Sequence, residues 1–499
     1  MDARNGGNLY ADIIEGLRTR ISRRGIVALV VLLFATGIAA GIFNFESLDG
    51  LPWDLGYYVQ ATHSLATRGV PEATFSGTAI DYNFIHHSYD KYPLAWAYQV
   101  FNTPWVVPIW HEIFLLAPAL ICMLFYQAVC RGNQIAPEPL GYLLAFLGWA
   151  WNPTVLFQVA WNYSFNILGL TLLAFAYLLY YQRKWLWLGA TLIALAFEKE
   201  EFGFISFTFC LMVAVEALFD RKLKRRQLLI SGALAVAAIS VSSYFTFTRR
   251  YPGFASFARA YGELGSSPGE AIKTLFLRPI VYIKTLTRAD AIQYFLFFGV
   301  TSFVWLKPRF SVAKYMIPVL PLILLNSLNS WGMAQLNMHY SLPIMVGLCA
   351  TLILGVFGSE LAGNRAFQLF LLITLVPLLW GHEFQSRTLR KGLTLWIHHA
   401  QERGLISRLI ASPDTVICCE DRLCTSLADH DNVFMIQACT AGSDLLKPYL
   451  GKTARFLVYS ETKLKPEETG SGLPRAEVPG RWSASTSFIK ISEPVRIIR

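Results

Sequence analysis

Charged residues are scarce in this sequence. Of its 499 residues, 15% are Asp, Glu, Lys or Arg, while 54% are hydrophobic and the mean hydropathy is +0.41. Soluble domains carry roughly 25% charged residues, so this composition argues against an ordinary soluble enzyme and is typical of a chain embedded in lipid. Many of the 14 Trp stand at the ends of apolar runs, as the aromatic belts of membrane proteins do.

Acidic residues are also few, with 33 Asp and Glu against 43 Lys and Arg, so the formal net charge is +10. A positive excess is found in nucleic-acid-binding proteins as well as in membrane proteins. Here the Lys and Arg residues lie mainly in short connections between apolar runs, where they act as a topology signal. We therefore expect no nucleic acid among the partners.

Cysteine is sparse, and the 8 Cys include no paired CxxC spacing, which argues against a zinc site. Half of them lie in or beside apolar runs, and the other half lie in the C-terminal region: Cys418, Cys419, Cys424 and Cys439. An oxidising compartment would allow this second set one or two disulfides. The sequence leaves their pairing open.

Eleven apolar stretches occur in the first 381 residues. We place them at 26–43, 105–128, 140–158, 164–181, 185–198, 202–219, 227–248, 291–306, 314–333, 340–357 and 366–381. Several are shorter than the ~20 residues that a perpendicular helix needs, so we expect some tilted or broken spans. The stretch 185–219 is compatible with two spans or with one long interrupted helix.

The basic residues orient these spans. Residues 1–25 contain a cluster of Arg immediately before the first stretch, which predicts a cytoplasmic N-terminal segment. No small-residue cleavage site follows, so we interpret 26–43 as a retained helix. Basic connections recur after every second span, and an eleventh span puts residues 382–499 outside. The sequence thus predicts a multi-pass protein of the inner (plasma) membrane.

Three segments are expected outside the bilayer, on the outer side. The loop 44–104, about 60 residues long, exceeds a mere connector and is expected to be functional. The segment 249–290 contains a helix start at Ser266–Glu270. Residues 382–499 have short apolar runs separated by helix-length segments, which predicts a small α/β domain whose last ~30 residues, rich in Gly, Pro and Ser, are loosely ordered. The predicted fold class is therefore mainly α, a polytopic transmembrane helical bundle of residues 26–381 with a C-terminal extracytoplasmic α/β domain.

Ionisable residues gather at one end of the spans. Counting crossings places these residues on the outer side: Asp54, His86, His87, Asp90, Lys91, Glu198, Glu200, Glu201 and His339. Arg249 and Arg250 belong to the outer segment 249–290. Charges facing lipid are costly, so charges at span ends must face water, each other or a bound group.

Each of these groups has a structural and a functional interpretation. Asp54 is either a helix cap opening Leu55–Ala66 or a general base. The stretch His86–Leu94 is either a solvated loop or a site for a phosphorylated ligand, with Lys91 supplying the positive charge. Phe197–Phe202 is either a tight solvated turn or a polar knot, and a lone His such as His339 is more often structural.

In this order, the motifs resemble a known family. The Asp-Leu-Gly that opens the outer loop, the His-rich stretch before the second span, the Lys-Glu turn and the later His-Tyr resemble an uncharacterised prokaryotic membrane-protein family of the GT-C glycosyltransferase superfamily. Asp90–Leu94 also resembles the Asp-Lys-Pro-Pro-Leu element of aminoarabinose and mannosyl transferases, with Tyr92 replacing the first Pro. One element departs from the pattern, because Tyr163–Asn166 stands where many relatives have a Phe-His-Pro-Glu-like sequence.

The resemblance implies inverting transfer of a sugar from a polyprenyl-phosphate donor to an unknown acceptor glycan, lipid or protein at the outer face. Asp54 is then the expected base and Asp90 the second choice, while a divalent cation (Mg or Mn) bridging the two stays open. The remaining residues of the expected substrate and phosphate site are Lys91, His86, His87, Arg249, Arg250, Glu200, Glu201 and His339.

Two other functions remain open. A transporter or flippase of lipid-linked sugars should show interrupted repeats and ionisable residues near the middle of the bilayer, whereas here charges gather at span ends and no internal repeat is visible. A non-catalytic assembly or scaffold protein fits the absence of a catalytic motif in the tail and the altered Tyr163–Asn166 element.

Overall fold

The computed structural model describes about three fifths of the chain. The residues described are 22–46, 55–74, 80–81, 88–152, 154–156, 158, 167–219, 230, 232–234, 236–238, 240, 261–299, 310–329, 339–357, 415–420, 423–424, 427, 430, 433–441, 446, 448, 452–459, 475–476, 482–485, 489–492 and 495–498. They fall into two compact units, each treated by itself below. The first comprises Met1–Thr36, Ile113–Gln158 and Asn166–Phe384, and the second comprises Gly37–Glu112, Val159–Phe165 and Gln385–Arg499.

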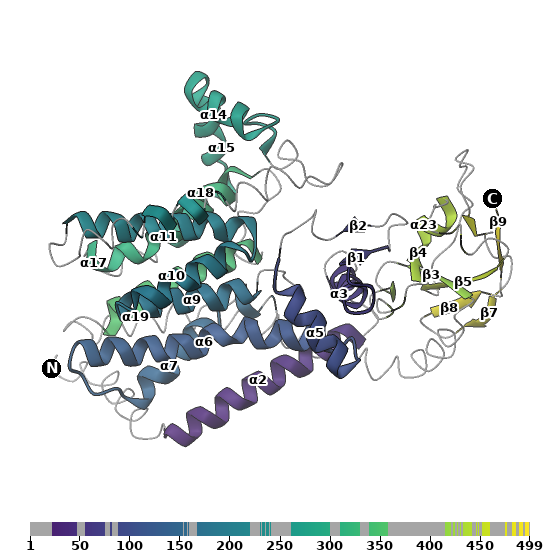
Figure 1. The fold of residues 1–499 in the computed structure, drawn as a ribbon, viewed down its shortest axis with the longest axis horizontal. Coiled ribbons are helices and arrows are strands. Elements are labelled where there is room, and N and C mark those ends of the chain that lie inside the picture. The colour runs from purple at the N-terminus through teal and green to yellow at the C-terminus, as the bar shows by residue number, and fades with distance from the viewer. Residues whose placement is uncertain are drawn as a thin grey trace, which may run out of the picture. The chain divides into compact units, whose positions relative to one another are not determined.

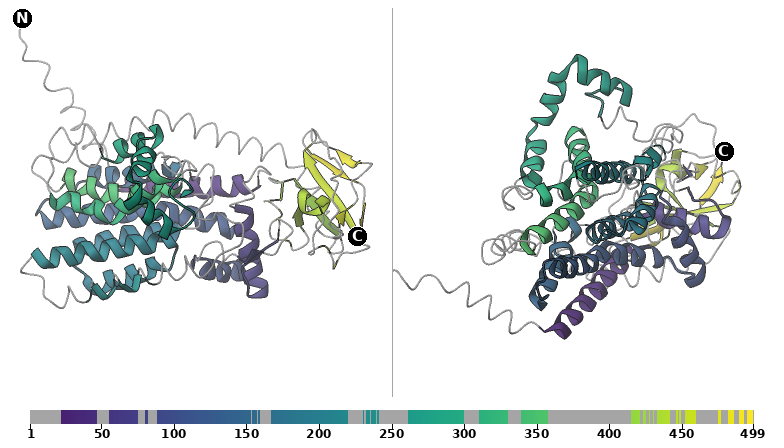
Figure 2. Two further views of the ribbon diagram at one scale, coloured as in Figure 1. Left: turned by 90° about the horizontal axis from the view of Figure 1, so that it is seen from above. Right: turned by 60° about the vertical axis from the view of Figure 1, so that its left-hand side comes forward.

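The first unit is a bundle of apolar helices, most of which run side by side (Figure 1, Figure 2). Its helices are α7 (Pro139–Ala150), α9 (Ile167–Tyr181), α10 (Trp185–Ala196), α11 (Glu200–Phe219), α14 (Pro268–Leu277), α15 (Pro279–Leu286), α16 (Ala289–Gly299), α17 (Phe310–Ala313), η3 (Lys314–Val319), α18 (Leu320–Leu328), η4 (His339–Ser341) and α19 (Leu342–Phe357). Helices α2 (Arg23–Glu46) and α6 (Val106–Gly132) each belong partly to both units.

Among the described residues, two helices are long and apolar enough to cross a membrane by length and composition, namely Arg23–Phe43 of α2 and Val106–Gly132. Shorter apolar helices, of 10 to 17 residues, include α7, α9, α10 and α19. The stretch 185–219 forms two helices, because Phe197, Glu198 and Lys199 interrupt the run and α11 packs against α10. The expected span 366–381 lies outside the described residues, and 227–248 is described only in part.

The bundle core contains large side chains that are fully buried, including Trp149, Tyr177, Phe202 and Phe209. Trp149 donates a hydrogen bond from Nε1 to the Leu115 carbonyl at 2.7 Å, which satisfies its polar atom inside the apolar core. A Cβ at Gly169 of α9 would collide with the Phe202 ring of α11. The absence of a side chain at Gly169 therefore makes room for this ring.

In the second unit, the segment between α2 and α6 contains α3 (Tyr57–Arg68), β1 (Glu72–Ala73), β2 (Ile80–Asp81) and α5 (Lys91–Phe101). Helix α3 packs against α5 and β1 and is buried on nearly every side, including its polar Gln60 and Ser64. Gln60 Oε1 accepts a hydrogen bond from the Thr74 amide at 2.6 Å, and Ser64 Oγ donates to the Val70 carbonyl at 2.6 Å. These bonds join α3 to the chain that follows it.

The sequence suggested a cap for the helix after Asp54 and a helix start at Ser266–Glu270, which correspond to α3 and α14. Helix α3 has Gly56 as its N-cap, without a side-chain hydrogen bond, while Asp54 lies outside the described residues. Helix α14 begins as expected, because Ser267 caps it by accepting a hydrogen bond from the Glu270 amide.

The C-terminal residues form a mixed sheet with a helix. Its elements are β3 (Thr415–Cys419), β4 (Val433–Met435), α23 (Ile436–Ala441), β5 (Thr453–Tyr459), β6 (Arg475–Ala476), β7 (Trp482–Ser485), β8 (Ile489–Ser492) and β9 (Val495–Ile498). Strand β3 pairs in parallel with β4 and β5, and β5 pairs antiparallel with β8 and β9. The end of the chain, expected to be loosely ordered, thus contributes β6–β9, because its short apolar runs complete the sheet beside β5.

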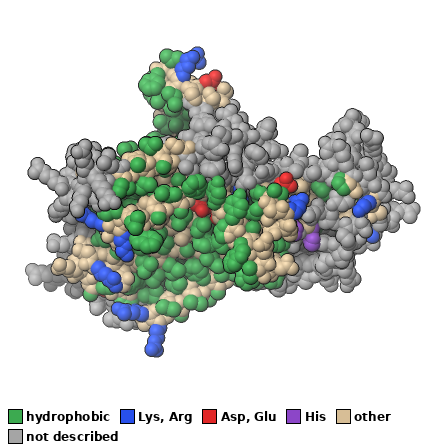
Figure 3. Space-filling model, in the orientation of Figure 1, with side chains coloured by type: hydrophobic (Ala, Val, Ile, Leu, Met, Phe, Trp, Pro, Cys, Tyr) green, Lys and Arg blue, Asp and Glu red, His purple; other side chains and the backbone are tan. Residues whose placement is uncertain are grey.

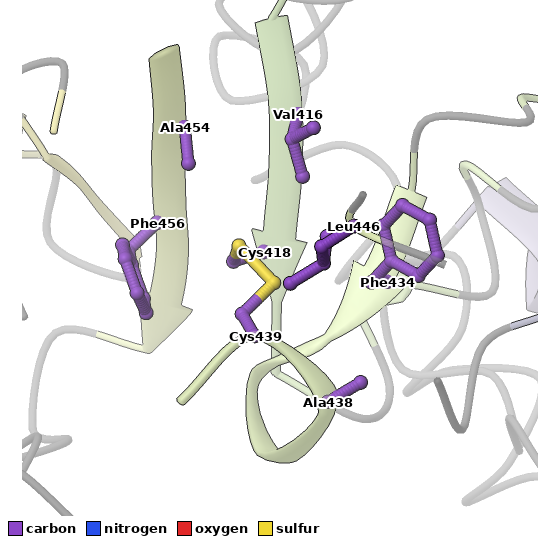
Figure 4. Packing of buried hydrophobic residues seen from close by; sticks show 8 residues of the cluster. All are labelled: Val416, Cys418, Phe434, Ala438, Cys439, Leu446, Ala454 and Phe456. Atoms are coloured by element: carbon purple, nitrogen blue, oxygen red, sulfur yellow. A yellow bond between two sulfur atoms is a disulfide. The ribbon is translucent and has the colours of Figure 1, made fainter. Parts of the chain in front are cut away.

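The core of this sheet is small and contains a disulfide. Cys418 of β3 is bonded to Cys439 of α23, and both lie among Val416, Phe434 and Phe456 (Figure 4). A second disulfide joins Cys419 to Cys424. The pairing that the sequence left open is therefore Cys418–Cys439 and Cys419–Cys424.

Candidate functional site

Asp90 is a buried carboxylate held by two hydroxyl groups. Its side chain is 1% exposed, and its Oδ1 accepts hydrogen bonds from Tyr58 OH at 2.6 Å and from Ser88 Oγ. No described group donates a hydrogen bond to Asp90 Oδ2, although that atom is buried. Buried carboxylate oxygens normally have partners, so an orphaned one points to a functional role.

Asp90 neither caps α5 with its side chain nor lies in a solvated loop. The residue precedes α5 but has helical dihedral angles, φ −58° and ψ −23°, and its side chain makes no capping hydrogen bond. A solvated loop is also excluded at this point of the chain, because Ser88, Asp90 and Lys91 are all buried. Neither capping nor solvation therefore accounts for the burial of Asp90.

Burial raises the pKa of Asp90 to about 6, even though the Ser88 and Tyr58 hydroxyls and the charge of Lys91 act to lower it. A carboxyl with such a pKa is ionised for the most part at neutral pH and still takes up a proton readily. This is the range in which a carboxylate works well as a general base.

Lys91 supplies a cation next to this carboxylate. Its side chain is only 3% exposed, and its Nζ lies 5.8 Å from the centre of the Tyr92 ring, a cation–π contact. Tyr92 itself is exposed. Asp90 and Lys91 together present one proton acceptor and one positive charge.

A second polar cluster lies in the first unit, around the turn between α10 and α11. Glu198 and Lys199 are buried, and Lys199 Nζ lies 3.3 Å from Glu201 Oε2. The same ammonium group is 5.4 Å from the centre of the Tyr340 ring. The sequence allowed a solvated turn or a polar knot at Phe197–Phe202. The burial of Glu198 and Lys199 and the Lys199–Glu201 ion pair agree with the polar knot.

More residues extend this cluster. Burial raises the pKa of Tyr261, and the charge of Glu201 raises it further, while a hydrogen bond with Asn329 opposes both. Arg288 donates hydrogen bonds to the Asn329 carbonyl at 2.6 Å and to the Ser327 carbonyl at 3.3 Å. The cluster therefore joins the turn before α11 to Arg288 at the start of α16, to Asn329 at the end of α18 and to Tyr340 of η4.

Helix α6 carries an ionisable pair inside its apolar sequence. His111 Nδ1 lies 3.0 Å from Glu112 Oε1, both side chains are buried, and no described group donates to Glu112 Oε2. Gly41 of α2 lies against Glu112, because a Cβ there would come within 3.0 Å of its Cγ. Charged groups inside a span are expensive and are usually functional.

The predicted site residues fall into three groups. The structure brings Asp90 and Lys91 together in the second unit, and Lys199 and Glu201 together in the first. Glu200 and His339 are described in their backbone alone. The remaining predicted residues lie outside the described part of the chain: Asp54, His86, His87, Arg249 and Arg250.

A divalent cation at this site would need oxygen ligands beside Asp90. In the described part of the chain, no group of three or more His, Cys, Asp and Glu is placed to hold a metal ion. The buried Oδ2 of Asp90 has the chemistry of an oxygen ligand, which Mg²⁺ and Mn²⁺ prefer. The partner ligand expected from the sequence, Asp54, lies outside the described residues.

Several site residues were hard to predict from the sequence. Tyr58 and Ser88 hold Asp90, yet they are ordinary polar residues 32 and 2 positions away. One usable signal was α3 itself, whose Gln60, Thr62 and Ser64 interrupt any apolar face and indicate a helix with polar contacts on several sides. His111 and Glu112 were detectable as ionisable residues within an apolar run.

Comparisons with known proteins give a family and two distant structural likenesses. Crystal structures of ArnT from Cupriavidus metallidurans, one bound to undecaprenyl phosphate and one in the apo state, are similar with TM-scores of 0.45 and 0.46. Each is 12% identical in sequence, and the likeness covers 93% of this chain and 98% of the other. No match is found among curated proteins. The family model described as "Predicted membrane protein (DUF2079)" matches residues 46–380, and the chain therefore belongs to this family of membrane proteins.

Proposed function

We propose that this protein is a membrane glycosyltransferase that transfers a sugar, with inversion, from a polyprenyl-phosphate-linked donor to an acceptor hydroxyl at the outer face of the membrane. The observation that carries the proposal is the Asp90 site, where a buried carboxylate with one unpartnered oxygen precedes a buried lysine. The sequence Asp90–Leu94 supports it, since it resembles the Asp-Lys-Pro-Pro-Leu element of lipid-dependent sugar transferases.

The reaction needs two groups from the protein. A carboxylate takes the proton from the acceptor hydroxyl, and the acceptor oxygen then attacks the anomeric carbon of the sugar. The bond between that carbon and the phosphate oxygen breaks, and the polyprenyl phosphate leaves with the electron pair. Phosphate is already a good leaving group, so a cation that stabilises its charge suffices and no general acid is required.

In this proposal Asp90 Oδ2 is the proton acceptor and Lys91 Nζ stabilises the departing phosphate. The pKa of about 6 keeps Asp90 ionised at neutral pH, and the hydrogen bonds from Tyr58 and Ser88 to Oδ1 keep the other oxygen oriented. Asp54, the first choice for the base from the sequence, is the alternative to Asp90 in this proposal. A Mg²⁺ or Mn²⁺ ion held by Asp90 and Asp54 would add positive charge beside the phosphate.

The polyprenyl chain accounts for the membrane setting. Its isoprenoid tail is apolar and belongs in the bilayer, whereas the phosphate and the sugar belong at the surface. The predicted outer loop 44–104 follows α2 and precedes α6 in the sequence, and both helices are apolar. A catalytic centre in this loop would meet the phosphate and the sugar at the surface while the tail stays in the bilayer.

The test compares three variants of the full-length protein in membranes with a radiolabelled polyprenyl-phosphate sugar pool. We expect Asp90→Asn to lower the transfer rate by about 10²- to 10⁴-fold, the usual contribution of a general base. Glu72→Gln, which neutralises a partly exposed carboxylate in β1, is the matched control and should transfer at the wild-type rate.

Asp54→Asn separates the two candidate bases. A loss in Asp54→Asn with wild-type transfer in Asp90→Asn would move the base to Asp54. Wild-type protein that binds the labelled donor and transfers nothing would contradict the proposal as a whole.

A transporter of lipid-linked sugars is a second candidate, favoured by the buried His111–Glu112 pair within α6. Intramembrane ionisable pairs of this kind often mark a substrate or proton pathway. The same labelled donor distinguishes the two functions. A transporter would move the donor between leaflets of reconstituted vesicles with its sugar still attached, and Glu112→Gln would stop this movement.

A further inference from the structure

Helices α14 and α15 expose an unusual amount of apolar surface. The side chains of Phe276, Leu277 and Ile280 are 77%, 68% and 67% exposed, and Ile272 and Ile283 are exposed as well. These two helices, Pro268–Leu286, are called the arm below. In Figure 3 the arm is covered largely by hydrophobic side chains, with charged side chains near its far end. A contiguous patch of this kind marks a surface that is normally covered by a partner or by lipid.

The direction of the arm narrows the choice of partner. Within the first unit, α14 and α15 run across the axes of α9, α10 and α11 and extend sideways from the bundle (Figure 1, Figure 2). Helices that cross a membrane lie near its normal, so an arm that runs across them lies closer to the membrane plane.

The arm leaves the bundle at one defined end. Helix α15 packs against α16 and α18, and Arg288, directly after it, donates hydrogen bonds to the carbonyls of Ser327 and Asn329 at the end of α18. This end also carries the Lys199 cluster, and the sequence places it at the outer side of the membrane. The arm therefore lies at the level where the bundle meets one surface of the bilayer.

Hydrogen bonds within the arm fix the positions of its two helices. Ser266 donates from its amide and its hydroxyl to Glu270 Oε2, at 2.7 and 2.6 Å, which fixes the start of α14. Tyr282 OH of α15 donates to the Ala271 carbonyl of α14 at 2.8 Å and ties the two helices together. In this arrangement the apolar side chains of α14 and α15 are exposed.

The charges on the arm suit phospholipid headgroups. Lys273, Arg278 and Lys284 are exposed cations on or between the two helices. Glu270 is an exposed acidic residue of α14, and its carboxylate accepts the hydrogen bonds of Ser266. An apolar face flanked by cations is the composition of helices that lie in the interface of a membrane.

We propose that α14 and α15 form an interfacial arm that lies in the headgroup region of the bilayer, with Phe276, Leu277 and Ile280 inserted among the acyl chains and the basic residues at the phosphates. The partner is the lipid surface itself. This inference does not rest on the proposed transfer reaction, since it concerns residues outside the Asp90 site.

The test places one fluorophore on the arm of the full-length protein in phospholipid vesicles. Cys122, Cys130, Cys210 and Cys349 are buried and the other four cysteines form disulfides, so a new cysteine in Phe276→Cys is the accessible thiol for an environment-sensitive dye. We expect lipids with a nitroxide near the top of the acyl chain to quench this dye at least twofold, and iodide in the water to quench it little.

Gly269→Cys is the matched control. Gly269 is exposed at the start of α14, and a side chain added there meets no neighbour within 4 Å. A dye at this position should be quenched by iodide more strongly than one at position 276. Iodide quenching at position 276 equal to that at 269 would overturn the proposal, as would a dye at 276 shielded from both quenchers, which would indicate a protein partner or a second copy.

Discussion

At the scale of single residues, Asp90 combines two properties that oppose each other. Its burial raises the free energy of the ionised form, and its hydrogen bonds from Tyr58 and Ser88 recover only part of that energy. A carboxylate without a catalytic task has no reason to stay ionised at such a place. Replacing it with a neutral amide of the same shape should therefore separate stability from activity.

We expect the free energy of unfolding of Asp90→Asn, relative to that of the wild type, to be higher at pH 7 than at pH 4 by about 2 kcal/mol, because the carboxyl pKa rises from 3.8 to about 6 on folding and only the wild type loses stability as this carboxyl ionises. The folded state binds more protons than the unfolded state between these two values. Wild-type stability therefore falls as pH rises through this window, and this pH-dependent gain of the variant should vanish below about pH 4. Thermal unfolding in detergent at pH 7 and pH 4 measures the difference in stability between variant and wild type. Glu72→Gln is the control. A stability difference between wild type and variant that is the same at both pH values would contradict the burial argument.

At the scale of elements, the contact between α9 and α11 depends on one missing side chain. Gly169 leaves the space that the Phe202 ring occupies, and Phe202 is fully buried. Small residues play this part in membrane helices, where close packing holds helices together without a hydrophobic driving force.

We expect Gly169→Ala to lower the free energy of unfolding by about 1–3 kcal/mol, because the added methyl group must displace the Phe202 ring or push α9 from α11. Gly232→Ala is the control, since a side chain there meets no neighbour within 4 Å. Unfolding in denaturant and detergent measures both. A Gly169→Ala variant as stable as the control would mean that the ring moves aside at no cost.

The elements themselves were largely predictable from the sequence. The apolar runs before and after Phe197–Lys199 gave α10 and α11, and three short runs gave β3, β4 and β5, because both kinds of element follow from local periodicity. Strands β6–β9 were missed, since their segments are short, rich in turn residues and ordered only by pairing in the sheet.

The site was less predictable than the fold. Asp90 and Lys91 stood out as adjacent charges before a helix, but their burial depends on α3 packing against α5, which no local pattern encodes. Arg288 shows the same limit. Its partners Ser327 and Asn329 lie about forty positions away, so only the folded chain brings them together.

At the scale of the whole molecule, the topology predicted from the basic connections stays open to a direct test. We expect alkaline phosphatase fused after Ala441 to be active, because the tail is predicted to lie outside and the enzyme folds only in an oxidising compartment. The same enzyme fused after Gln182, in the basic connection between α9 and α10, should be inactive. An inactive fusion at Ala441 with comparable expression would mean that the number of crossings is even.

The bond between Cys418 and Cys439 also dictates an order of assembly. It lies in the core of the tail domain and joins β3 to α23, so the domain is complete only once both thiols have been oxidised. The cytoplasm keeps thiols reduced. In the predicted topology, the ribosome therefore delivers this domain in an immature form, and its maturation waits until the segment has been exported. A cell without its thiol-oxidising machinery would insert the helices as usual and accumulate a protein whose last domain alone is exposed to proteases.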